Sequence, residues 1–253
     1  MLGSNGEASS LDDREKLDLV RTARARAAGR FVLVGTGLES TAATVDLTGR
    51  VADAGADAVL VLTPHYYKSQ MTVDVLRRHF EAVADASPVP VYLYSVPVFT
   101  GIPFPVSLAA AMASHPRVAG MKESSGDVGL LGRILASVPS SFAVACGSAP
   151  VLYPALCLGA MAGVIAVACC APDVASALYR AFLAGDHERA RRLQLALVPL
   201  ATAVTATYGV PGLKLAMDVA GLRGGVPRLP LVPAPAAARG ELLRLVAEAR
   251  AAV

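Results

Sequence analysis

The stretch VYLYSVPVFTGIPFPVSLAAAMASHPRVAGMK, residues 91–122, contains one complete unit of a pattern that repeats along the chain. Two short apolar runs, Val91–Tyr94 and Val118–Lys122, lie on either side of a helical segment at Pro105–Ser114. Short apolar strands that alternate with helices are typical of a parallel sheet with crossover connections. The stretch therefore predicts a β/α/β unit.

The same alternation extends in both directions from this stretch. Further strands are predicted at residues 31–34, 58–62, 142–146 and 163–167. Helices are predicted at residues 11–28, 41–54, 72–86, 128–137, 150–158, 172–184, 188–205, 211–219 and 241–251. Ser10, Ser40 and Asp127 stand where N-caps are expected. Successive strands are about 20 to 33 residues apart, the length of one β/α unit.

This repeat predicts an α/β fold of the (β/α)8 TIM-barrel type with a C-terminal helical extension. The β/α units of such a barrel need roughly 250 residues. Six strands are predicted, and Met1–Gly3 fits the end of another. We therefore expect a barrel that lacks its first β/α unit. Residues 1–170 would form the barrel, and residues 171–253 its last helix and the extension, within a single domain.

Composition excludes several classes of protein. The 253 residues are 54% hydrophobic and 17% charged, which is enough apolar material for a sizeable core. A net charge of +3 is too balanced for a nucleic-acid surface. Charged residues, Gly or Pro interrupt each apolar run before it is long enough to span a membrane. Residues 1–10 show no export signal, so we expect no membrane association and a cytoplasmic protein.

The cysteines and histidines give no support to a metal site. The four cysteines show no C-x-x-C spacing and lie in apolar stretches, so we expect them to pack in the core: Cys146, Cys157, Cys169 and Cys170. The four histidines form no i, i+4 pair: His65, His79, His115 and His187. No metal is predicted.

Lys122 and Tyr94 are the candidate catalytic residues. Each ends an apolar strand, and the C-terminal ends of barrel strands are where such folds place their active sites. Burial of Lys122 there would favour the neutral amine, which can attack a carbonyl carbon. Tyr94 could carry protons as general acid and base. The alternatives are a lysine that extends to solvent and a tyrosine that covers the core with its hydroxyl in water.

The segment Gly3–Glu7, GSNGE, is a candidate anion site. It offers small residues, side-chain hydroxyl and amide groups and backbone N–H groups just before a predicted helix. Such an arrangement suits a carboxylate. An ordinary turn would have the same composition, and both interpretations stay open.

Several segments resemble one known superfamily. GMKESSGD, residues 120–127, is similar to the Schiff-base lysine segment of the dihydrodipicolinate synthase and N-acetylneuraminate lyase superfamily. Other segments of the chain resemble further parts of the superfamily and stand in the same order as there. They are similar to its carboxylate-binding loop (residues 3–7), interfacial tyrosine motif (63–67), catalytic tyrosine segment (93–97) and pocket-closing loops (147–148 and 163–165). Within it, Leu93–Pro97 and Tyr208–Lys214 look most like the 4-hydroxy-2-oxoglutarate aldolases.

The resemblance implies a (β/α)8 barrel enzyme that works without a metal or an organic cofactor. It implies reversible cleavage of a 4-hydroxy-2-oxo acid to pyruvate and an aldehyde such as glyoxylate. Lys122 would form a covalent imine with this small 2-oxo acid, and Tyr94 would carry the proton. A homo-oligomer, dimer or tetramer, would be the working form.

The resemblance also implies roles for six further residues. Ser4 and Asn5 would hold the C1 carboxylate of the substrate. Ser124 and Gly147 would line the pocket, and Ile165 belongs to a loop that would close it. Tyr66 would reach the site of a neighbouring subunit.

Phe99 departs from the synthases of the superfamily. They commonly carry an arginine at this position, which binds the distal carboxylate of the second substrate. An apolar ring cannot make that bidentate contact. This difference counts against the synthase, and equally against an aldehyde partner that carries a carboxylate. Two alternatives to the aldolase stay open: a synthase-like condensation of pyruvate in lysine biosynthesis and a non-catalytic, truncated remnant.

Overall fold

A computed structural model describes residues 1–253 as two compact units. The first unit is Met1–Ala145 and the second is Cys146–Val253. Each unit is described by itself below.

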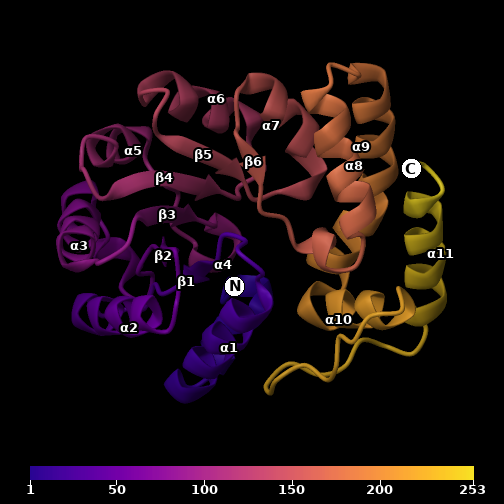
Figure 1. Cartoon of the computed structure of the whole chain (residues 1–253), viewed down its shortest axis with the longest axis horizontal. Coiled ribbons are helices and arrows are strands. Elements are labelled where there is room, and N and C mark those ends of the chain that lie inside the picture. Colours follow the sequence, from indigo (N-terminus) through magenta and orange to yellow (C-terminus); the bar gives the residue numbers. More distant parts are fainter. The chain divides into compact units, whose positions relative to one another are not determined.

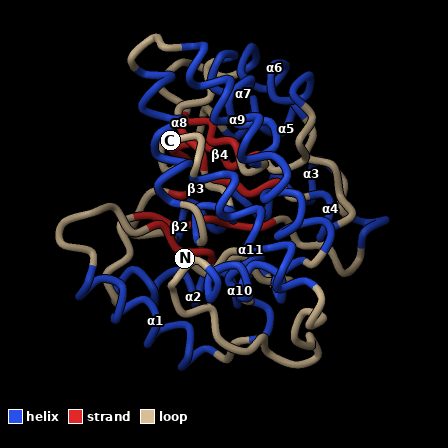
Figure 2. Tube along the Cα trace, turned by 90° about the vertical axis from the view of Figure 1, so that its right-hand side faces the viewer, coloured by secondary structure: helices blue, strands red, loops and turns tan.

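Parallel strands form the centre of the first unit. They are β1 (Leu33–Gly35), β2 (Ala58–Leu62), β3 (Val91–Ser95), β4 (Val118–Glu123) and β5 (Ala143–Cys146). Each strand lies next to the one that follows it in the sequence, as Figure 2 shows for β2, β3 and β4. The last residue of β5, Cys146, is the first residue of the second unit. The register pairs Leu62 with Tyr94, and Tyr94 with Lys122. The carboxyl ends of three neighbouring strands therefore lie side by side.

Helices accompany these strands. They are α1 (Asp13–Arg26), α2 (Thr41–Asp53), α3 (Val73–Ala86), α4 (Pro97–Thr100), α5 (Val106–Met112) and α6 (Val128–Ser137). Helices α2, α3, α5 and α6 lie on the outer side of the strands (Figure 1). Helix α1 packs on α2, α2 on α3, α3 on α5, and α5 on α6. The strand–helix alternation predicted for this part of the chain is confirmed. The short helix α4 was not predicted; Pro97 at its first position has the φ that helices require.

The N-caps confirm two predictions and correct one. Ser40 caps α2, and Asp127 caps α6, where its carboxylate accepts the Leu130 N–H at 2.8 Å. Ser10 is not the cap of α1, because it ends a 3-10 turn. Asp12 caps this helix through a reciprocal pair of hydrogen bonds with Glu15. That pair satisfies two N–H groups at once, which a serine at position 10 could not do.

The first residues lie beside β1. The Gly35 N–H donates to the Met1 carbonyl at 2.9 Å, so Met1 continues the hydrogen-bonding pattern of the strands, as expected of a strand end. The segment then turns through a 3-10 helix, Ser4–Gly6. The prediction that the first β/α unit is absent stays a prediction.

Helices dominate the second unit. They are α7 (Leu152–Leu158), α8 (Pro172–Leu183), α9 (His187–Thr202), α10 (Gly209–Val219) and α11 (Ala238–Arg250), with a π-helical turn at Ala203–Thr207 after α9. The strand predicted at residues 163–167 is wrong in its extent. Strand β6 is only Ala162–Gly163, and Ala166–Cys169 forms a 3-10 helix. Apolar residues fit either structure when they are buried, so their pattern did not separate the two.

The cores of both units are apolar, as the composition predicts, but two cysteines lie outside them. Phe80 and Phe104 are the largest fully buried side chains. Cys146 and Cys170 are buried as expected, whereas Cys157 and Cys169 are exposed, so the prediction for these two is wrong. Their helical segments are apolar on more than one face, and only packing decides which face is covered.

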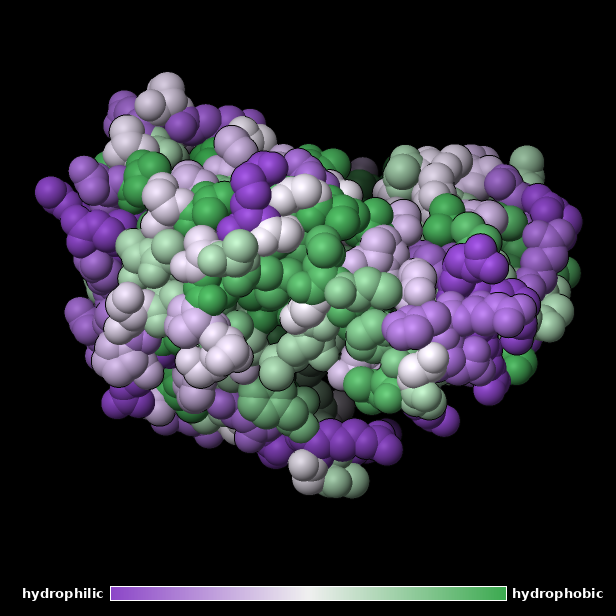
Figure 3. Space-filling model, turned by 90° about the horizontal axis from the view of Figure 1, so that it is seen from above, coloured by the Kyte–Doolittle hydropathy of each residue, from purple (hydrophilic) through white to green (hydrophobic).

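The surface keeps many apolar side chains. On the face drawn in Figure 3, apolar residues form a broad patch bordered by hydrophilic ones. No helix is both long and apolar enough to cross a membrane. Parallel strands in sequence order, each followed by a helix, are the arrangement of part of a (β/α)8 barrel, and to this extent the predicted fold class is confirmed.

Candidate active site

Lys122 and Tyr94 meet at the carboxyl ends of β4 and β3. They are paired in the register, and side chains of paired residues project to the same face of a sheet. Lys122 Nζ donates to Tyr94 Oη at 3.2 Å and lies 4.2 Å from the centre of its ring. The two residues are only 9% and 5% exposed. The structure thus places a buried amine against a phenol, so neither side chain extends freely into solvent.

Ser4 joins this pair from the other end of the first unit. Its hydroxyl oxygen lies 3.4 Å from Tyr94 Oη, although 90 residues separate the two in the chain. Asn5 follows in the same 3-10 turn and is half-buried. The amine, the phenol and the serine hydroxyl therefore form one continuous chain of polar groups. No contact of the Asn5 side chain with these three groups is seen, so its role stays a prediction.

Ser124 begins the loop that leaves β4. Its backbone N–H donates to the Ser95 carbonyl at 2.9 Å, which holds the loop against the end of β3. Its hydroxyl oxygen is buried and has no hydrogen-bond partner in the protein. Buried polar groups nearly always have a partner, so this hydroxyl is available for a bound molecule.

Glu123 is a buried residue that the sequence analysis missed. Its carboxylate accepts the Ser125 N–H at 2.8 Å and lies 3.4 Å from the Ser95 hydroxyl. Burial raises the pKa of this carboxyl group, and hydrogen bonds from Ser125 and Ser95 oppose the shift. A charged residue at the end of an apolar strand was the signal that could have drawn attention to it.

Tyr66 lies apart from Lys122 on the surface of the first unit. Its side chain is 76% exposed. Its backbone is fixed by Glu39, whose carboxylate accepts the N–H groups of His65 and Tyr66 at 2.9 and 2.8 Å. Within the single chain the structure does not bring this side chain to Lys122.

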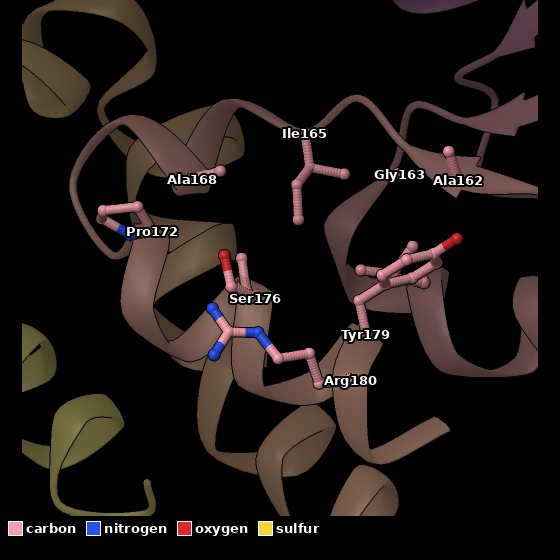
Figure 4. Close-up of a pocket in the computed structure, with 10 residues that line it drawn as sticks. Ala162, Gly163, Ile165, Ala168, Pro172, Ser176, Tyr179 and Arg180 are labelled. Atoms are coloured by element: carbon pink, nitrogen blue, oxygen red, sulfur yellow. The ribbon is translucent and has the colours of Figure 1, made fainter. Parts of the chain in front are cut away.

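Gly147 and Ile165 belong to the second unit. Ile165 lines a cavity of about 380 Å³ in that unit, and Figure 4 shows its side chain above Ser176 and Arg180. The other walls come mainly from α8 and β6. Gly147 is half-buried at the end of β5.

Phe99 is on helix α4, shortly after the strand that carries Tyr94, and more than half of its side chain is exposed. Because residue 99 is a phenylalanine, no guanidinium group is present at this position to bind a carboxylate. In the whole chain, His, Cys, Asp and Glu side chains form no group of three that could hold a metal ion.

Comparison with known proteins identifies the family. The model of the dihydrodipicolinate synthetase family matches residues 1–249, almost the whole chain. The chain belongs to this family. The resemblance stated from the sequence motifs is confirmed at this level, whereas no comparison supports the narrower group of 4-hydroxy-2-oxoglutarate aldolases.

Two curated relatives of this dihydrodipicolinate synthetase family member carry the same name. The chain is 38% identical over 242 residues to the 4-hydroxy-tetrahydrodipicolinate synthase of an Exiguobacterium species, and the match covers 95% of this chain and 82% of the relative. The protein of the same name from Archaeoglobus fulgidus is 36% identical over 231 residues, with coverage of 91% and 78%. Their length beyond the match is a minor part of each relative.

Solved structures agree with the family. A dihydrodipicolinate synthase from Bacillus anthracis superposes with a TM-score of 0.92 at 28% identity, covering 98% of this chain and 84% of the other. The enzyme from Acinetobacter baumannii, solved in complex with pyruvate, gives 0.90 at 28% identity, with coverage of 98% and 85%. A likeness over nearly the whole chain supports the same architecture.

Proposed function

We propose that this chain is an enzyme that activates pyruvate as a Schiff base on Lys122. The observation that carries the proposal is the buried Lys122 amine, 3.2 Å from the hydroxyl of Tyr94. A lysine in such a place can act as a nucleophile toward a 2-oxo group. The neighbouring phenol is within the distance that proton transfer requires.

The proposed reaction balances without a metal or an organic cofactor. The Lys122 amine attacks C2 of pyruvate, the carbonyl oxygen leaves as water, and an imine forms between Nζ and C2. Loss of a proton from C3 gives an enamine, and C3 then attacks the carbon of an aldehyde whose oxygen takes up a proton. Where the aldehyde carries an amino group, that nitrogen attacks C2, closes a ring through a new C=N bond and releases the Lys122 amine. For an aldehyde without an amino group, water cleaves the imine and restores the amine. Tyr94 Oη carries protons in these steps.

The other polar groups would orient the 2-oxo acid. Ser4 and Asn5 would hold its C1 carboxylate, since the Ser4 hydroxyl already contacts the Tyr94 hydroxyl. The unpartnered Ser124 hydroxyl supports a further hydrogen bond to the substrate. We propose a homo-oligomer as the working form, which the exposed Tyr66 supports as a contact for a neighbouring subunit.

For the second substrate, the relatives favour condensation over cleavage. The curated relatives named above are 4-hydroxy-tetrahydrodipicolinate synthases. The product in this name is a ring that contains one nitrogen. Pyruvate supplies three of its carbons. A four-carbon amino aldehyde, aspartate 4-semialdehyde, would supply the other four carbons and the nitrogen. We propose this condensation as the reaction of the chain. The narrower aldolase interpretation made from sequence motifs has less support.

One observation favours a second candidate. Phe99 lies where the synthases are expected to carry an arginine for a distal carboxylate, and its ring cannot bind one. The second candidate is therefore cleavage of a 4-hydroxy-2-oxo acid to pyruvate and an aldehyde. If that aldehyde is glyoxylate, a residue other than Phe99 has to bind its carboxylate. The imine chemistry on Lys122 is the same for both candidates.

The test is intact-mass spectrometry after incubation with pyruvate and sodium borohydride, which reduces an imine to a stable amine. We expect one reduced pyruvyl adduct on the wild-type chain and none on Lys122→Ala. Lys16→Ala is the matched control, because Lys16 is also a buried lysine and contacts Asp13 instead. We expect Lys16→Ala to form the adduct like the wild type.

Two outcomes would separate the hypotheses. Folded wild-type protein without an adduct would refute the Schiff-base proposal and leave the non-catalytic alternative. If the adduct forms, turnover is measured with pyruvate plus aspartate 4-semialdehyde and, separately, with 4-hydroxy-2-oxoglutarate. Turnover of only the second substrate would overturn the condensation and support the aldolase.

A further inference from the structure

A second residue pair lies directly beyond Tyr94 and Lys122. The register pairs Ser95 with Glu123 at the last positions of β3 and β4. The Ser95 hydroxyl donates to Glu123 Oε1 at 3.4 Å, and the backbone N–H of Ser125 donates to the same oxygen at 2.8 Å. Both strands and the loop after β4 are therefore joined through one carboxylate.

This carboxylate is buried without a cation. Glu123 is 3% exposed, and no lysine, arginine or histidine forms an ion pair with it. Burying an unpaired carboxyl group is unfavourable, because the charged form loses its hydration. An apolar residue would fill this position with less loss of stability. A buried, unpaired acid next to a reactive group is a candidate for a role beyond packing.

The contacts show what the carboxylate holds. Ser125 is two residues beyond Glu123, so its N–H closes the loop that starts at Ser124. The Ser124 N–H donates in turn to the Ser95 carbonyl at 2.9 Å. These hydrogen bonds therefore hold together the carboxyl ends of β3 and β4, directly after Tyr94 and Lys122. Strand ends without such contacts fray, because their last backbone groups have no ladder partner.

We infer that Glu123 is a positioning residue that holds the end of β4 against β3 and so keeps the Lys122 amine beside the Tyr94 hydroxyl. The inference rests on the proposed Schiff-base function. Glu123 itself does not touch the amine; it acts through Ser95 and the loop at Ser124 and Ser125. It also fixes the backbone of Ser124, whose free hydroxyl lies in this loop.

The geometry at Lys122 is sensitive to small movements. Attack on a carbonyl requires the reacting atoms at about 3 to 3.5 Å, and a displacement of about 1 Å can reduce a rate about 100-fold. A lysine side chain is flexible, so its position depends on the backbone that carries it. Loss of the Glu123 contacts would therefore slow imine formation by displacing the Lys122 amine. The amine and the phenol themselves would both still be present.

The experiment compares Glu123→Ala with Glu123→Gln by the rate at which borohydride traps the pyruvate adduct. The glutamine side chain keeps an oxygen that can accept from Ser95 and Ser125, whereas alanine has no acceptor. We expect Glu123→Ala to form the adduct about 10- to 100-fold more slowly and Glu123→Gln to recover most of the rate. A rescue by glutamine distinguishes positioning by hydrogen bonds from a requirement for the charge.

Thr48→Val serves as the matched control for lost stability. Thr48 donates a buried hydrogen bond to Thr36 at 3.0 Å, from helix α2 in the same unit. Thr48→Val removes a buried hydrogen bond, as Glu123→Ala does, but away from β3 and β4. We expect the control to trap pyruvate at the wild-type rate.

Each outcome decides the inference. Folded Glu123→Ala that traps pyruvate at the wild-type rate would overturn it, and so would Glu123→Gln that is as slow as Glu123→Ala. If Glu123→Ala does not fold, Ser95→Ala replaces it, and a wild-type rate there overturns the inference. Absence of an adduct on the wild type itself refutes the proposed function, and the inference with it. If the wild type forms the adduct, the proposed function holds, and a wild-type rate in the Glu123 variant then refutes the inference alone.

Discussion

His79 makes the stability of the first unit depend on pH. It lies on helix α3, is 6% exposed, and packs its ring edge-on against Phe80 at 5.3 Å. Its Nδ1 is 2.9 Å from the Thr41 hydroxyl, whereas its Nε2 is buried without a partner. Burial therefore lowers the pKa of the His79 imidazole from 6.5 to about 4.

The sign and size of the effect follow from proton binding. Between pH 6.5 and about pH 4 the unfolded chain binds a proton at His79, whereas the folded chain does not. The free energy of unfolding therefore falls as the pH falls through this window. Each pKa unit corresponds to about 1.4 kcal/mol, so the limit is about 3 kcal/mol, and most of it is lost by about pH 4.5.

The assay is urea unfolding of the wild type and His79→Leu at about pH 7.5 and about pH 4.5. Other titrating groups are common to both proteins, so their contributions cancel when the two pH-dependent losses are subtracted. We expect the wild type to lose roughly 2 to 3 kcal/mol more than His79→Leu. Equal losses in the two proteins would refute the reasoning, because they would mean that the folded state also binds the proton.

Two further predictions concern backbone packing and capping. In Gly120→Ala the new Cβ would lie 2.0 Å from the Ala143 carbonyl oxygen, a backbone atom that cannot move without disturbing β4 and β5, so we expect a marked fall in melting temperature and a loss of pyruvate trapping. A wild-type melting temperature would contradict this expectation. Asp12→Ala removes the acceptor for the Glu15 N–H, and we expect the free energy of unfolding in urea to fall by about 1 kcal/mol, with trapping unchanged. An unchanged unfolding midpoint would show that the cap adds nothing.

The sequence predicted the parts of this protein that depend on local pattern. Strands β2 and β4 lie within one residue of the predicted ranges, and helix α6 begins and ends as predicted. Apolar runs of four to six residues and the alternation with helices determined them, because a strand or a helix buries the face that its period creates. The same pattern places Lys122 and Tyr94 at neighbouring strand ends.

Only the tertiary structure decided how distant groups meet. The contact of Ser4 with Tyr94 joins residues 90 positions apart, and the burial of Glu123 depends on Ser95 from another strand. The exposure of Cys157 and the 3-10 helix after β6 also depend on which apolar face is covered. Local sequence sets periodicity, but the free energy that selects one arrangement comes from packing and hydrogen bonds between segments remote in the chain.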